Sequence, residues 1–136
     1  MADNVVRKAI DKVNTKFSEI GRKEAFVEFL STYFLCEMAY KKVLSAYHKD
    51  NGISDTRTNM KIFYDDIDNV LKFREMYVDA ATKDLLFNNK RNNRWNKSAR
   101  KLRDSIAHNI NANDIEEIYV RKEEFSTAMN VFLRMF

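Results

Sequence analysis

The chain of 136 residues contains no proline and only two glycines, so few positions interrupt a helix. Its single cysteine, Cys36, excludes an internal disulfide and leaves no second thiol for a metal site. No apolar run reaches the roughly 18 residues that a membrane span requires. The first ten residues include charged side chains and lack the apolar core of a secretory signal. These absences predict a cytoplasmic protein without a membrane segment.

Hydrophobic residues make up 45% of the chain, and 12% of all residues are aromatic. This is enough apolar material for one domain with a buried core over residues 1–136. Apolar side chains recur at helical spacing throughout. We therefore expect an all-α fold, a single bundle of four main helices plus a short one, or four to five helices in all.

The positions of these helices follow from the spacing of apolar residues and from turn-forming residues between them. An amphipathic helix carrying Val6, Ile10, Val13, Phe17 and Ile20 ends at Gly21. Further helices are expected over about 23–48, 59–81 and 93–109, and from about 121 onward. Loops are expected at 88–93 and 109–114.

Acidic residues are absent between Leu85 and Arg103, a segment that holds seven of the chain's 24 basic residues. Such a concentration is typical of a strip that binds the phosphates of a nucleic acid. The alternative is a solvated helix face without a ligand. If the strip binds RNA, the side chains expected to hold its backbone are Arg94, Lys97, Arg100 and Lys101.

The helix expected over 93–109 carries the segment RKLRDSIAHN. At about 100° per residue, Trp95, Ala99, Leu102, Ile106 and Ile110 fall on one face and predict its core seam. His108 falls opposite that seam and is therefore expected to be exposed. Asp104 precedes His108 by four residues, so its carboxylate is expected to reach the imidazole.

Arg103 and His108 are separated by about 140° of rotation on a regular helix, so one helix does not aim both at the same point. They meet if the helix ends near Asn109. They also meet if two copies pack about a twofold axis, so that each arginine approaches the other copy's histidine. The second arrangement predicts a homodimer with a shared site.

The pattern Arg103-Asp104-x-x-x-His108, near the end of an all-helical chain, resembles the signature of the HEPN superfamily. The resemblance implies a metal-independent endoribonuclease, usually dimeric, of toxin–antitoxin, abortive-infection or other antiviral systems. It also implies a restraining partner, such as an antitoxin or a nucleotidyltransferase. The second motif position is most often Asn in that family and is Asp104 here. Some relatives instead serve as non-catalytic nucleotide- or partner-binding modules, which is the alternative function.

The chemistry of RNA fits these residues, because RNA carries its own nucleophile in the 2′-hydroxyl and needs no metal or cofactor. The imidazole of His108 is a side chain that can accept or donate a proton at neutral pH. Arg103 suits the scissile phosphate and the charge that develops on it. The expected products carry a 2′,3′-cyclic phosphate and a 5′-hydroxyl. We therefore assign Arg103, His108, Asp104 and Glu37 to the predicted catalytic site.

Two assignments have an alternative. Glu37 lies within the apolar seam of the second expected helix and either orients Arg103 or pairs locally with Lys41. Trp95 either stacks on an RNA base or belongs to the core. For the whole chain, a second alternative is a helical interaction protein whose basic strip docks an acidic partner.

Overall fold

A computed structural model describes residues 2–90 and 95–136. All regular secondary structure in these two ranges is helical, so the all-α prediction is confirmed. The helices are α1 (Ala2–Ser18), α2 (Arg22–Asp50), α3 (Met60–Asp65), α4 (Ile67–Phe73), α5 (Ala80–Phe87), α6 (Ala99–His108), α7 (Ala112–Val120) and α8 (Lys122–Leu133). The predicted count of four to five helices is too low for this part of the chain.

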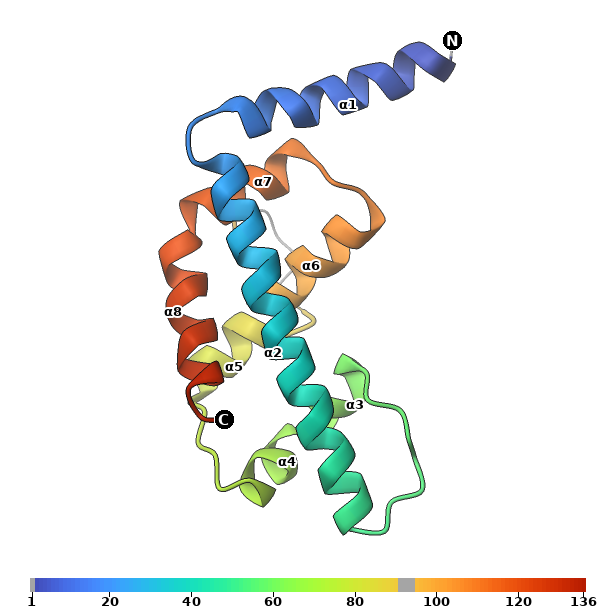
Figure 1. Ribbon diagram of the computed structural model, residues 1–136, viewed down its shortest axis with the longest axis vertical. Helices are drawn as coiled ribbons and strands as arrows, with labels where there is room; N and C mark the ends of the chain where they lie inside the picture. Colours follow the sequence, from blue (N-terminus) through green and yellow to red (C-terminus); the bar gives the residue numbers. More distant parts are fainter. Residues whose placement is uncertain (1, 91–94) are drawn as a thin grey trace.

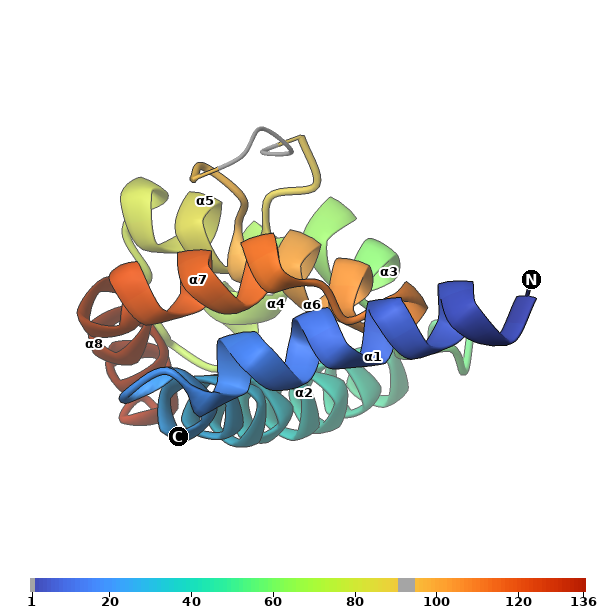
Figure 2. The same cartoon turned by 90° about the horizontal axis from the view of Figure 1, so that it is seen from above.

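The long helix α2 forms the axis of the molecule (Figure 1). It packs most extensively against α8 and α7, and its C-terminal half packs against α3 and α4. Helix α5 contacts α6 and α8. Seen from above, α1 runs alongside α7, across the end of the molecule at which α2 begins (Figure 2). Helix α6 thus packs against α5 and α7, and an ion pair connects it to α2.

Aromatic rings connect the core across four helices. Tyr40 of α2 stacks on Phe63 of α3 with ring centroids 4.8 Å apart. Phe63 meets Phe87 at the end of α5 at 5.5 Å, and Phe87 meets Phe132 of α8 at 5.2 Å. Edge-to-face pairs of this kind add to the stabilisation from burial. Phe87 is fully buried, so the C-terminal end of α5, from which the chain continues towards α6, is anchored in the core.

The prediction of a single helix over 59–81 is wrong. Most of its apolar residues are buried as expected, with Ile62 and Phe73 half-buried, but α3 ends at Asp65 and α4 begins at Ile67. Glu75 has a φ of 56°, in the left-handed region, so the backbone leaves the helix after Phe73. The next helix, α5, starts only at Ala80. Spacing alone did not reveal these breaks, because short helices that bury one face share the same periodicity.

The expected helix over 93–109 begins later, and the expected loop over 109–114 is shorter. Ser98 caps α6, its hydroxyl accepting a hydrogen bond from the Lys101 backbone N–H at 3.1 Å. Asn111 caps α7, with its side-chain oxygen accepting from the backbone N–H of Asp114 at 2.9 Å. Helix α7 was therefore missed, since its cap lies in a segment rich in asparagine that is typical of loops.

Helix α1 has an apolar face that is only half covered. Helix α1 ends at Ser18, earlier than predicted, and Ile20, expected on its apolar face, lies outside it and is 89% exposed. Gly21 ends the turn that follows with a φ of 82°, and Val13 and Phe17 pack against the core. Val6 and Ile10 on the same face remain 57% and 43% exposed. The first turns of α1 extend beyond the body of the molecule (Figure 1).

Helix α2 also carries apolar side chains on its outer surface, which we call the α2 stripe. Its members are Val27, Phe34, Leu35 and Met38, each between 48% and 53% exposed. Single exposed apolar residues are ordinary, but these four lie on one side of α2, within about 100° of rotation. Within the described residues, no helix is long and apolar enough to cross a membrane.

Candidate functional site

Helix α6 is placed by its buried face. Ala99 and Leu102 are fully buried, as predicted for the core seam, and Ile106 is half-buried. Trp95 and Ile110, also predicted on that seam, lie outside the helix and are 39% and 40% exposed. The core assignment of Trp95 is therefore wrong. The helix continues to His108, and Asn109 follows in an extended conformation.

Arg103 lies between two carboxylates. Its Nη2 is 3.9 Å from Oε1 of Glu37 on α2, and its Nη1 is 3.6 Å from Oδ1 of Asp104. Both separations exceed hydrogen-bond length, so they hold the guanidinium electrostatically without saturating its donors. The Arg103 side chain is 35% exposed. Its N–H groups are therefore open to an anion from solvent.

Glu37 makes both of the contacts that the sequence left as alternatives. One carboxylate oxygen faces Arg103, and the other lies 3.8 Å from Nζ of Lys41. Glu37 has only 20% of its side chain exposed, whereas Lys41 has 46%. The local pair with Lys41 and the orienting contact with Arg103 therefore coexist in one arrangement.

Two buried tyrosines that the sequence indicated only as core residues lie close to this cluster. Burial raises the pKa of Tyr40, and the negative charge of Glu37 raises it further. Burial also raises the pKa of Tyr33 well above its ordinary value, with smaller contributions from Tyr40 and Glu37. Both phenols are thus neutral at physiological pH. Neither phenol therefore adds a negative charge to this cluster, and the carboxylates at ion-pair distance from Arg103 are Glu37 and Asp104.

His108 is exposed, as predicted from its place opposite the core seam. The expected contact between Asp104 and His108 is not found among the described residues, and the Asp104 carboxylate faces Arg103 instead. Because α6 is regular up to His108, Arg103 and His108 are separated by about 140° of rotation and about 7.5 Å along the axis. The helix does end near Asn109, as the single-copy arrangement requires, but Arg103 and His108 both precede that end, so this angular separation remains within one copy.

The basic strip is partly committed to contacts inside the protein. Arg94 lies outside the described residues. Lys97 places its ammonium 2.7 Å from Oδ1 of the buried Asp114. Arg100 donates from Nη1 to the carbonyl of Phe87 at 3.2 Å. The Lys101 ammonium makes no hydrogen bond or ion pair with the described residues, so it remains open to a ligand, as does Arg103.

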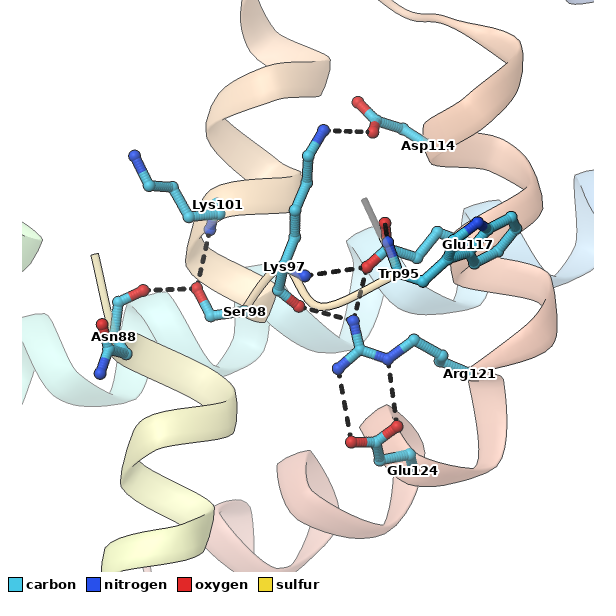
Figure 3. Close-up of polar contacts among 9 residues, drawn as sticks. All are labelled: Asn88, Trp95, Lys97, Ser98, Lys101, Asp114, Glu117, Arg121 and Glu124. Atoms are coloured by element: carbon cyan, nitrogen blue, oxygen red, sulfur yellow. Dashed lines mark hydrogen bonds and ion pairs between the residues drawn. The ribbon is translucent and has the colours of Figure 1, made fainter. Parts of the chain in front are cut away.

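A buried polar network that the sequence did not indicate lies beside the strip (Figure 3). Glu117, 1% exposed, accepts hydrogen bonds from the backbone N–H groups of Trp95 at 2.9 Å and Lys97 at 3.0 Å. Its partner Arg121 donates to the Lys97 carbonyl at 2.7 Å and to Glu124 at 3.1 Å. The sequence could have indicated ion pairing here, because residues three or four apart are neighbours on a helix. Arg121 follows Glu117 by four residues and precedes Glu124 by three.

The remaining reactive groups lie elsewhere. Cys36 is buried, as predicted, and burial raises the pKa of its thiol to about 12, which suppresses the reactive thiolate. His48 is buried at the end of α2. Among the described residues, no three His, Cys, Asp or Glu side chains lie close enough together to hold a metal ion.

Comparison of the chain with protein-family models, with curated proteins and with solved structures found no match. The residues of this chain and the geometry of α6 and its neighbours are therefore the basis for its function.

Proposed function

We propose that the protein is a metal-independent endoribonuclease of HEPN type that acts as a homodimer, as a toxin or antiviral effector. The observation that carries the proposal is the setting of Arg103. Two carboxylates hold its guanidinium at ion-pair distance while about a third of the side chain stays exposed, on the helix that also presents the exposed His108. An arginine held in this way is suited to a phosphodiester.

The reaction requires only proton transfer and charge stabilisation. The 2′-oxygen of the RNA forms a bond to phosphorus while His108 of one subunit accepts its proton. The bond between phosphorus and the 5′-oxygen breaks, and His108 of the partner subunit donates a proton to that oxygen. Arg103 stabilises the additional negative charge on the phosphoryl oxygens. The products are a 2′,3′-cyclic phosphate and a 5′-hydroxyl.

The α2 stripe supports the homodimer. Phe34 precedes Glu37 by three residues and so borders it on the helix surface, and Met38 follows directly. Packing two stripes together would remove half-exposed apolar side chains from water. It would also bring both Glu37–Arg103 pairs towards the same axis. A shared site overcomes the angular separation of Arg103 and His108 within one copy.

Cleavage of a synthetic RNA by the purified protein tests the proposal. The wild type should cleave in the presence of EDTA, and mass spectrometry should identify cyclic phosphate ends. Arg103→Ala and His108→Ala should each lower the rate by about 100-fold or more. Arg7→Ala, which removes an exposed arginine from α1, should cleave like the wild type.

Induction of the same four proteins in a bacterial host tests the biological effect. Growth arrest is expected for the wild type and for Arg7→Ala, and not for the two site variants. Intact RNA after incubation with excess wild type would overturn the nuclease proposal. Nucleotide binding by that inactive protein would instead favour the non-catalytic nucleotide-binding module.

A further inference from the structure

Asp114 joins three segments of the chain through one buried carboxylate. It is 1% exposed at the start of α7. One oxygen faces the Lys97 ammonium at 2.7 Å. The other accepts hydrogen bonds from the amide of Asn111, at 2.9 Å, and from the hydroxyl of Ser105. A buried carboxylate is tolerated only where its charge and its acceptor sites are matched in this way.

Ser105 is the member of this group that belongs to α6. It lies two residues after Arg103 and three before His108, so Ser105 and His108 are neighbours on the helix surface. Arg103 is about 200° away from Ser105 around the helix axis. Helix α6 is therefore held on two sides, by Glu37 of α2 at Arg103 and by Asp114 of α7 at Ser105.

Asp114 takes part in the cap of α7 and pairs with Lys97 without help from the hydrogen bond with Ser105. Asn111 caps α7 through its own bond to the Asp114 backbone N–H, and Lys97 neutralises the carboxylate. The bond to Ser105 adds a directional constraint on α6 one turn before the helix ends. A constraint there limits rotation of the last turn, which carries the exposed His108.

We propose that Asp114, through its hydrogen bond from Ser105, is a positioning residue that sets the direction of the His108 imidazole. This inference rests on the proposed function, in which His108 transfers protons. A displacement of about 1 Å in a catalytic group lowers turnover by up to about 100-fold. Loss of the bond should therefore affect the chemical step and leave RNA binding, which depends on basic side chains elsewhere, unchanged.

The test compares Ser105→Ala with Ser105→Thr, which keeps a hydroxyl. Ser105→Ala should lower kcat by about 10- to 100-fold with KM and the thermal midpoint close to wild type. Ser105→Thr should recover most of kcat. The matched control is Ser126→Ala, which removes a helix serine whose hydroxyl accepts a bond from Asn130 at 3.3 Å. An unchanged kcat in Ser105→Ala, or a kcat that falls only in parallel with the thermal midpoint, would overturn the proposal.

A second readout is independent of activity. The chain has only two histidines, so the imidazole resonances of His108 can be assigned by comparison with His108→Ala. Ser105→Ala should shift these resonances, and Ser126→Ala should not. If the wild type leaves RNA intact but the resonances shift, the proposed function fails and the positioning role stands. If the protein cleaves RNA and the resonances of Ser105→Ala match the wild type, the positioning role fails alone.

Discussion

The two oxygens of Glu37 face different cations, Arg103 of α6 at 3.9 Å and Lys41 of α2 at 3.8 Å. The lysine is the more exposed of the two partners, with 46% of its side chain accessible against 35% for the arginine. Solvent screens the local pair more strongly than the pair between helices. The contact between Glu37 and Arg103 therefore has the larger effect on the geometry of the candidate site.

Removing the charge of Glu37 should separate these two roles. Glu37→Gln weakens the electrostatic hold on Arg103 and is expected to lower RNA cleavage by about tenfold. Lys41→Gln leaves the contact with Arg103 in place and should cleave within about twofold of the wild type. Initial rates of cleavage of a synthetic RNA measure both. Equal losses in the two variants would show that Glu37 acts through Lys41.

The shared site predicts that an inactive subunit suppresses an active one. With wild type and His108→Ala mixed in equal amounts and allowed to exchange, about one quarter of the dimers have both histidines. Activity should fall to about one quarter of that of the same total amount of wild type, instead of to about half. A value of one half would mean that each subunit works independently.

The α2 stripe supplies the control for that mixing experiment. Met38→Asp places a charge at the C-terminal end of the stripe, where Met38 is 52% exposed, so the folded monomer should tolerate it while self-association is lost. A His108→Ala chain that also carries Met38→Asp should no longer suppress the wild type. Sedimentation velocity should show a dimer for the wild type and a monomer for Met38→Asp.

Spacing of apolar residues was sufficient for the helical class and for the first, second and last helices, because apolar residues recur along one face of each, although α1 packs only the second half of its face against the core. Spacing was not sufficient where the backbone conformation determines whether a residue belongs to a helix. Trp95 shows this, since its place in the periodic pattern predicts the core seam. Its φ of 65° and the hydrogen bond from its N–H to Glu117 instead hold it outside α6. Glu117 is 22 residues away, beyond the reach of a local pattern.

The same distinction applies to the site. The exposure of His108 follows from rotation along one helix, so the sequence predicted it correctly. The involvement of Lys97 with Asp114 depends on how α7 packs beside α6, and charge composition alone assigned that lysine to RNA. Asp114 and Glu117 gave no sequence signal for burial, because acidic residues are rarely buried without partners from elsewhere in the chain.

The buried network around Glu117 should be important for stability. Glu117→Ala leaves two backbone N–H groups without their acceptor and removes the buried carboxylate partner of Arg121. Arg121 keeps the Lys97 carbonyl and Glu124 as acceptors. Glu117 is 1% and Arg121 is 8% exposed. Breaking a buried pair from one side typically costs about 3–5 kcal/mol. Urea denaturation should show that loss. Glu123→Ala, at an exposed position of α8, should change the free energy of unfolding by less than about 0.5 kcal/mol.

Acid should loosen the attachment of α1 through Glu116. This carboxylate of α7 accepts hydrogen bonds from Arg22 at 3.0 Å and from Lys16 of α1 at 3.2 Å. The bond from Arg22 is the main reason that the pKa of Glu116 lies below its ordinary value of 4.5, and the bond from Lys16 lowers it further. A carboxyl whose pKa is lower in the folded state adds stability that is complete above about 4.5 and is lost as pH falls through the folded pKa.

Comparison with Glu116→Gln isolates this contribution, because every other titrating group is shared by the two proteins. The difference in the free energy of unfolding should be largest near neutral pH, shrink below about pH 4.5 and disappear once Glu116 is protonated in the folded state. Salt should reduce the difference, since both ion pairs have more than a fifth of their side chains exposed. A difference that stays constant from pH 7 to pH 3 would mean that Glu116 stabilises the junction of α1, α2 and α7 by packing, with no contribution from its charge.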